Sequence, residues 1–227
     1  MGRSNIDWTP FFLSLKLATV VTLILLLIGI PLGWYLSNLR RWYKPILESV
    51  VALPIVLPPS VLGFYLLIIF AQNSPIGKIL EKMGIHLLFT FWGLVVASVI
   101  YSLPFMVQTL QAGFESIDRR IIEASYLAGK GVIPTLFRVV LPNMKGALIT
   151  GIVITFAHTI GEFGVVLMVG GAIPGKTEVA SVAIYNAVEE MDYTKAHIYS
   201  AILLIFSFVV LMGVYLFRYW EGKKWSK

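Results

Sequence analysis

One stretch of the chain has the residue types and spacing of a phosphate-binding loop. Residues 170–177, Gly-Gly-Ala-Ile-Pro-Gly-Lys-Thr, match the pattern Gly-x4-Gly-Lys-Ser/Thr, whose backbone amides hold the phosphates of a nucleotide. Such a loop works only between a buried strand and the start of a helix, where unpaired amides face the ligand. Here the stretch follows a long apolar run, and Pro174 has no amide hydrogen to donate. The sequence therefore predicts a turn and not a nucleotide site.

A second candidate for chemistry is an acid and a histidine within an apolar run. Glu162 lies well inside a predicted membrane span, where a central charge costs about 2.5 to 3.5 kcal/mol. His158 lies four residues earlier on the same helical face, so we expect the two side chains to pair. Two roles for Glu162 stay open: a structural hydrogen bond to a neighbouring helix or loop, and a gate or proton-linked role.

The composition excludes most other chemistry and indicates an integral membrane protein. Of the 227 residues 58% are hydrophobic and 13% charged, with a mean hydropathy of +0.84, whereas soluble domains have about 25% charged residues. There is no cysteine, and His86, His158 and His197 are too scattered for a zinc site. We therefore expect no catalytic residue, metal or other cofactor. The net charge of +6 follows the ends of the apolar runs, so no nucleic-acid partner is expected.

Five apolar runs are long enough to cross the lipid bilayer as helices, each needing about 20 residues. Strands of a membrane barrel would be about half that length and would alternate in polarity. We therefore predict an all-α, polytopic transmembrane helical bundle that forms one domain over residues 1–227. The predicted spans are 11–36, 46–71, 87–110, 144–170 and 196–217.

Lysine and arginine residues give the orientation, because they gather on the cytoplasmic side of a membrane. Of the 18, 12 lie on the side of the loop 115–142, 5 lie on the other side, and Lys16 lies inside the first span. We therefore expect the N-terminus outside the cytoplasmic (inner) membrane and the C-terminus in the cytoplasm. The amphipathic segment 178–195 is too short and too acidic for a span. We place it as an outer-side helix and leave open whether it enters the bilayer.

The second span is interrupted by Pro54, Pro58, Pro59 and Gly63. Breaks of this kind leave backbone carbonyls unpaired, which is tolerated only against protein or a water-filled cavity. The pattern is typical of a mobile helix that lines a pore, and the alternative is a rigid kink that serves packing. The candidate residues for a path or gate are Pro58, Pro59, Ser60, Gly161, Glu162 and Phe163.

Residues 123–142, Glu-Ala-Ser-Tyr-Leu-Ala-Gly-Lys-Gly-Val-Ile-Pro-Thr-Leu-Phe-Arg-Val-Val-Leu-Pro, interrupt the apolar sequence with charge and glycine. Asp118 can cap a helix that Gly129 ends, and a second short helix can start at Gly131 and end at Pro142. The residues expected to face the protein body are Ile121, Ile122, Leu127, Leu136, Phe137 and Val140, which leaves Glu123, Lys130 and Arg138 to a cytosolic partner. The prediction is a pair of short surface helices joined at a glycine elbow.

This stretch resembles the Glu-Ala-Ala-x3-Gly-x9-Ile-x-Leu-Pro signature of ABC importer permeases, with Ser125 and Val139 replacing Ala and Ile. In that family the loop is the coupling helix that inserts into a groove of a cytosolic ATPase. The resemblance implies this role for Glu123, Ala124, Ser125, Gly129, Arg138, Leu141 and Pro142. Residues 53–67 and 161–181 further resemble the molybdate-type permeases and their sulfate relatives, in which Arg often precedes the Gly-Glu-Phe-Gly motif where this chain has His158.

The resemblance implies a type I ABC importer permease-like fold and an oxyanion substrate, molybdate or tungstate first and sulfate or thiosulfate second. Substrate contact by Glu162 is not expected, because a carboxylate repels an anion. The expected partners are a second copy of the chain, two cytosolic ABC ATPase subunits and an extracytoplasmic oxyanion-binding protein, which together move the anion by ATP-driven alternating access. Two other classes of protein are alternatives to a permease subunit. An ATP-hydrolysing enzyme would need a nucleotide fold, and an ion-coupled secondary transporter would need paired broken helices, of which the sequence shows one.

Overall fold

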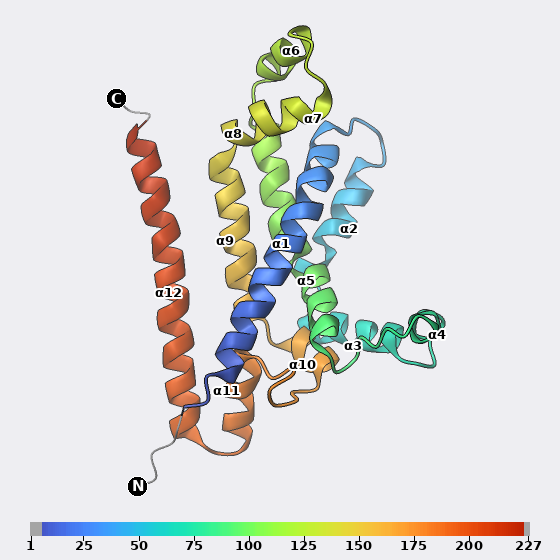
Figure 1. Cartoon of the computed structure of the whole chain (residues 1–227), viewed down its shortest axis with the longest axis vertical. Coiled ribbons are helices and arrows are strands. Elements are labelled where there is room, and N and C mark those ends of the chain that lie inside the picture. The colour runs from blue at the N-terminus through green and yellow to red at the C-terminus, as the bar shows by residue number, and fades with distance from the viewer. Residues whose placement is uncertain (1–5, 225–227) are drawn as a thin grey trace.

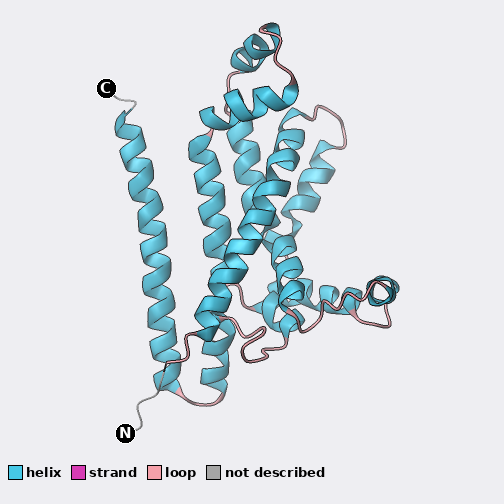
Figure 2. Ribbon diagram, in the orientation of Figure 1, coloured by secondary structure: helices cyan, strands magenta, loops and turns pink. Residues whose placement is uncertain are grey.

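The computed structural model describes residues 6–224, and this part of the chain is made of helices and connecting loops (Figure 2). The first helices are α1 (Thr9–Asn38), α2 (Lys44–Val56), α3 (Pro59–Phe70), α4 (Pro75–Lys82) and α5 (Phe91–Glu115). A compact group follows: α6 (Arg119–Leu127), α7 (Val132–Thr135), the π-helical turn η1 (Leu136–Val140) and α8 (Leu141–Asn143). The chain ends with α9 (Lys145–Gly161), α10 (Gly164–Gly170), α11 (Ala180–Glu189) and α12 (Tyr193–Lys224).

The centre of the molecule is a bundle in which α5 packs against both α1 and α9. Small residues let these long apolar helices approach closely, since no hydrophobic effect drives helices together within a bilayer. A Cβ at Gly29 of α1 would lie 2.7 Å from Met106 Cγ of α5. On the other side of α5, a Cβ at Gly113 would lie 2.6 Å from Ala147 Cβ of α9. The three helices share one apolar core.

The predicted span 46–71 is not one helix. α2 and α3 meet at an angle of 108°, so α2 lies beside α1 while α3 and α4 run sideways from the bundle (Figure 1). The sequence explains the break. Pro58 and Pro59 are consecutive, neither has an amide hydrogen, and Pro59 can occupy only the first turn of the new helix.

The predicted span 144–170 is also divided. α9 ends at Gly161, Glu162 is extended with ψ 132°, and α10 starts at Gly164. α10 then packs against α3, and two glycines permit the contact: a Cβ at Gly63 would lie 2.8 Å from Met168 Cβ, and one at Gly164 would lie 2.8 Å from Pro59 Cβ. The two breaks are therefore neighbours in space. A second broken helix exists, contrary to our reading of the sequence.

The other helices extend past or fall short of the predicted spans at their ends. α5 starts at Phe91 and not at residue 87, because the Thr90 hydroxyl accepts a hydrogen bond from the Gly93 amide and caps the helix there. α12 is longer than predicted, and α11 forms the predicted amphipathic helix within 178–195. The C-terminal end of α12 lies at the same end of the molecule as α6, whereas the first turns of α1 lie at the opposite end (Figure 1). Arg3 and Lys227, used for the orientation, lie outside the described residues.

The segment that matches the phosphate-binding pattern is a turn after a helix. Gly171 ends α10 in the left-handed region with φ 66°. The Thr177 hydroxyl donates to the Gly170 carbonyl at 2.7 Å and accepts from the Ile173 amide at 2.9 Å. The hydroxyl that would bind a metal–nucleotide complex in a true phosphate loop therefore closes the turn on itself.

Candidate functional site

The predicted surface helices form a compact knob at one end of the bundle, α6 to α8 (Figure 1). Asp118 caps α6, with its Oδ1 accepting a hydrogen bond from the Arg120 amide at 2.9 Å. Gly129 takes the left-handed conformation with φ 77°, which reverses the chain after α6. The Ser125 and Thr135 hydroxyls, both buried, lie 2.9 Å apart and join the two arms of the elbow.

The second arm of the knob differs from the simple helix that was predicted. It contains a π-helical turn, in which the Leu141 amide donates to the Leu136 carbonyl. Pro142 gives a reason for the wider turn, because in a regular helix its ring would clash with the carbonyl four residues earlier. The arm then turns by 81° at Met144 into α9. Pro142 thus lies just before the corner between the knob and the bundle.

The prediction that the apolar side chains of the knob all face the protein body is wrong. Ile122, Leu136 and Val140 pack into the central core. Leu127 is 90% exposed, and Phe137 is 58% exposed. Further exposed apolar residues of the knob are Ile121, Tyr126, Val132 and Ile133. An exposed apolar surface of this kind is typical of a protein–protein contact site.

The predicted coupling residues all lie in the knob, and they differ in exposure. Glu123, Ala124, Gly129, Arg138 and Pro142 are exposed, and Leu141 is half-buried. Ser125 is buried and is bonded to Thr135, so its side chain fastens the knob and does not reach its surface.

The path candidates lie at a cavity of about 600 Å³ beside the two helix breaks. Its lining is Pro59, Ser60, Tyr101, Ala157, His158, Gly161, Glu162, Phe163 and Gly164. Five of the six candidates predicted from the sequence are among these residues. The sixth, Pro58, is the N-cap of α3 and does not line the cavity.

The predicted pair of His158 and Glu162 does not form. His158 Nδ1 lies 3.0 Å from Ser102 Oγ, and its ring packs on Phe105 with centroids 4.0 Å apart. Glu162 is 4% exposed, and neither of its carboxylate oxygens has a hydrogen-bond partner among the described residues. The pairing fails because the helix ends at Gly161, so the four-residue spacing no longer places the two side chains on one helical face. The Ser98 hydroxyl of α5 is a polar neighbour of this carboxyl group, but neither group has a hydrogen bond of good geometry, so the burial of a charge would not be fully compensated.

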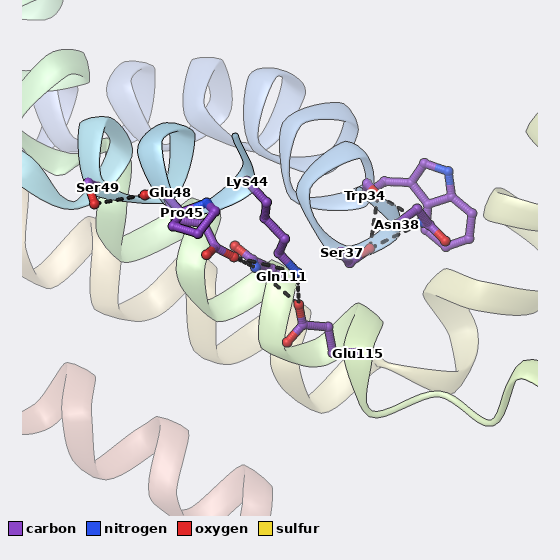
Figure 3. Close-up of polar contacts among 9 residues, drawn as sticks. All are labelled: Trp34, Ser37, Asn38, Lys44, Pro45, Glu48, Ser49, Gln111 and Glu115. Atoms are coloured by element: carbon purple, nitrogen blue, oxygen red, sulfur yellow. Dashed lines mark hydrogen bonds and ion pairs between the residues drawn. The ribbon is translucent and has the colours of Figure 1, made fainter. Parts of the chain in front are cut away.

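A network of polar side chains ties α2 to the end of α5 (Figure 3). The side-chain amide nitrogen of Gln111, Nε2, donates to Glu48 Oε1 at 2.6 Å and to Glu115 Oε1 at 3.1 Å. Lys44 Nζ lies 3.2 Å from Glu115 and 3.6 Å from Glu48. Three residues, 116–118, separate Glu115 of this network from α6, so the network fixes the N-terminal end of α2 next to the start of the knob.

This network and the cavity share one face of α5. Tyr101 lines the cavity, and Gln108, Ala112 and Glu115 line a smaller hollow of about 270 Å³ between α2 and α5. These positions are separated by three, four or seven residues, which is helical spacing. Gln108, Ala112 and Glu115 are exposed, so no helix of the described chain covers them.

Sequence reasoning did not single out Tyr101, Gln108, Gln111 or Glu48. A signal was present, because Gln108, Gln111 and Glu115 recur at helical spacing toward the end of an otherwise apolar span. Polar residues on one stripe of a membrane helix face a cavity or another chain more often than lipid.

Comparison with known proteins agrees with this architecture. The sequence model of one family, described as "Binding-protein-dependent transport system inner membrane component", matches residues 29–226. The molybdenum transport system permease protein ModB of Azotobacter vinelandii is 47% identical over 95% of this chain and 96% of its own length. A probable sulfate transport system permease protein, cysT of Chlorella vulgaris, is 30% identical over 92% of this chain and 79% of its own.

One solved structure with the same fold is a bacterial alginate ABC transporter in complex with an alginate pentasaccharide-bound periplasmic protein. The matching chain superposes with a TM-score of 0.74 at 16% identity, over 93% of this chain and 78% of its own length. At this identity the likeness concerns the fold, and it confirms the predicted class of helical bundle.

Proposed function

Since the chain belongs to the family of binding-protein-dependent transport system inner membrane components, we propose that it is the membrane-spanning subunit of an importer for molybdate or tungstate. The predicted family resemblance is confirmed, and the chain is a permease subunit and not itself an enzyme. The observation that carries the choice of anion is the 47% identity to a molybdenum permease along nearly the full length of both chains. The sulfate relative at 30% supports sulfate as the second candidate.

The knob is the proposed docking site for a cytosolic ATPase. Its exposed apolar residues Leu127, Ile133 and Phe137 are typical of a protein–protein contact site, and exposed Glu123 and Arg138 supply charges on the same knob. The knob therefore faces the cytoplasm in our proposal, with the N-terminus outside and the C-terminus inside. The excess of lysine and arginine at this end supports the same orientation.

The proposed translocation path runs along the uncovered face of α5, from the cavity to the network. Both are open at the protein surface, and a single chain does not enclose them. We propose that a second copy of the chain closes the path about a twofold axis, since cyclic dimers are the commonest closed assembly. The two helix breaks would then lie at the path, where unpaired backbone groups are tolerated. In our proposal the domain crosses the membrane through α1, the bent pair α2–α3, α5, α9 and α12, of which α1, α5 and α12 are each long and apolar enough to cross alone.

The connections of the knob suggest how movement at the ATPase reaches the path. α5 leads into α6 through residues 116–118, and α8 leads into α9 through Met144. α5 carries Tyr101 and α9 carries His158, which lie on two walls of the cavity. A displaced knob would therefore move both walls together. Alternating access becomes a two-state equilibrium whose states differ in the positions of α5 and α9.

The test is uptake by proteoliposomes that contain the chain, its ATPase subunits and the extracytoplasmic binding protein. We expect ATP-dependent accumulation of labelled molybdate that excess tungstate suppresses more strongly than sulfate. A preference for sulfate would give the function to the second candidate. Uptake in the absence of the ATPase would refute the importer altogether.

A coupling variant makes the test specific to the knob. Gly129→Leu should uncouple ATP hydrolysis from uptake, because leucine at φ 77° costs about 1 to 2 kcal/mol and distorts the elbow. Gly131→Ala is the matched control, since φ there is −73° and the nearest atom to an added Cβ is 3.9 Å away. Normal coupling in Gly129→Leu would show that the elbow does not transmit the movement.

A further inference from the structure

A pocket of about 380 Å³ lies between the end of α1 and the junction of α5 with the knob. Its lining includes Trp34, Asn38, Arg40, Phe114, Glu115 and Arg119. The Phe114 and Trp34 rings pack edge to face with centroids 5.2 Å apart and form an apolar wall. The volume is within the range of small-molecule sites.

The charge in this pocket is mainly positive. Arg40, Lys44 and Arg119 line it, against the single carboxylate of Glu115. Lys44 is already paired with Glu115 at 3.2 Å (Figure 3). Arg40 and Arg119 have no ion pair within the described chain, 6–224. Two arginines are therefore free to hold an anion, and a guanidinium can form two parallel hydrogen bonds to one phosphate.

An apolar stripe of α1 leads to the pocket along the surface. Leu23, Leu27, Pro31 and Tyr35 are all exposed, with Leu27 at 76%. Their spacing of four residues places them along one side of the helix, and Asn38 at the pocket follows on that side. A ligand with an anionic head and an apolar tail would match both features at once.

Aromatic residues indicate that the pocket lies at the depth of the lipid head groups. Trp34 lines the pocket, and three more aromatic residues follow Trp34 within nine positions of the chain: Tyr35, Trp42 and Tyr43. Trp and Tyr are enriched where the hydrocarbon region meets water. Basic pockets between membrane helices at this depth suit anionic lipid head groups.

We propose that this pocket binds the phosphate of an anionic phospholipid, held by Arg40 and Arg119, with an acyl chain along the exposed stripe of α1. The lipid would then contact α1, α5 and the first residues of the knob together. The proposal does not depend on which oxyanion is transported.

The test uses the full chain purified in detergent and titrated with phosphatidylglycerol or with phosphatidylcholine of the same acyl chains, with bound lipids counted by native mass spectrometry. We expect one phosphatidylglycerol to bind more tightly than phosphatidylcholine. The double variant R40Q/R119Q should weaken that site about thirtyfold, since each cation next to an anionic lipid contributes about a fivefold factor.

The control is R41Q/R120Q, which removes the same charge from the neighbouring positions in the chain. Arg41 and Arg120 are exposed and do not line the pocket, so their replacement should change the affinity less than threefold, which is below one fivefold cation factor. Equal losses in the two double variants would overturn the proposal, because they would reveal general charge attraction. Equal affinity for the two lipids would overturn it as well.

Two further experiments distinguish a bound lipid from free phosphate and from a contact with the ATPase. Inorganic phosphate and glycerol phosphate, added at millimolar concentration, should fail to displace phosphatidylglycerol, because they lack the acyl chain. Complete displacement by either would identify a site for free phosphate and overturn the lipid proposal. If R40Q/R119Q lowered the affinity for the ATPase and left lipid binding unchanged, the pocket would belong to the protein contact instead.

Discussion

The exposed apolar tip of the knob allows a prediction that separates docking from folding. Leu127 is 90% exposed, so Leu127→Ala removes almost no packing from the chain itself. If docking buries this side chain, the loss is about 0.8 kcal/mol for each carbon group removed, about 2 kcal/mol in all. The dissociation constant for the ATPase should then rise about thirtyfold.

Leu136→Ala is the matched control, because the same atoms are removed from a residue of the same knob that is 9% exposed and packs in the core. It should lower the stability of the chain by about 2 to 5 kcal/mol. The dissociation constant would be measured by binding of labelled ATPase to the chain in nanodiscs, and stability by thermal unfolding of the same samples. If Leu127→Ala lowered the melting temperature as Leu136→Ala does, or left the affinity unchanged, the docking role of the tip would be wrong.

Three other outcomes follow from the geometry. Ser125→Ala should destabilise the knob by about 1 to 3 kcal/mol, because it leaves the buried Thr135 hydroxyl unpaired; thermal unfolding should show part of this loss restored when Thr135→Val is added. Gly164→Ala should lower uptake by pushing α3 away from α10, since its Cβ would lie 2.8 Å from a proline of α3, whereas Gly146→Ala meets nothing within 4 Å, does not line the cavity and should transport normally. Lys44→Gln should cost at most about 1 kcal/mol, because the ion pairs are partly exposed, and the difference from the unsubstituted chain should shrink in high salt.

Much of the fold follows from local rules that the sequence contains. The length of the apolar runs predicts membrane helices, and short-range chemistry predicts several of their ends. Asp118 caps α6 and Gly129 ends the first arm of the elbow as expected from residue type. Each of these features depends on residues that are a few positions apart, so no knowledge of tertiary contacts is needed.

The second helix break shows where local rules fail. The break at residues 58 and 59 is predictable, because both residues are prolines. At the second break the residues are Glu162 and Phe163, and neither of these residue types prevents a helix from continuing. The break there depends on partners distant in the sequence: the Glu162 carbonyl accepts a hydrogen bond from Ser181 Oγ at 2.5 Å, and Gly164 allows Pro59 to approach. Helical spacing assumed through the break produced the wrong pairing of His158 with Glu162.

The knob shows a different limit. The sequence pattern shows which residues of the knob are apolar. It does not show whether their side chains are buried by the chain itself or by another protein. We assumed that the chain covers all of them, and Leu127 and Phe137 instead point away from it. The apolar residues of the knob have two different environments: Leu136 and Val140 hold the knob to the bundle, whereas Leu127 and Phe137 stay exposed, as the proposed docking role requires. In the proposed mechanism, a docked protein contacts the exposed apolar face of the knob. Because the opposite face is packed in the core, a displacement of the knob would be transmitted to α5 and α9.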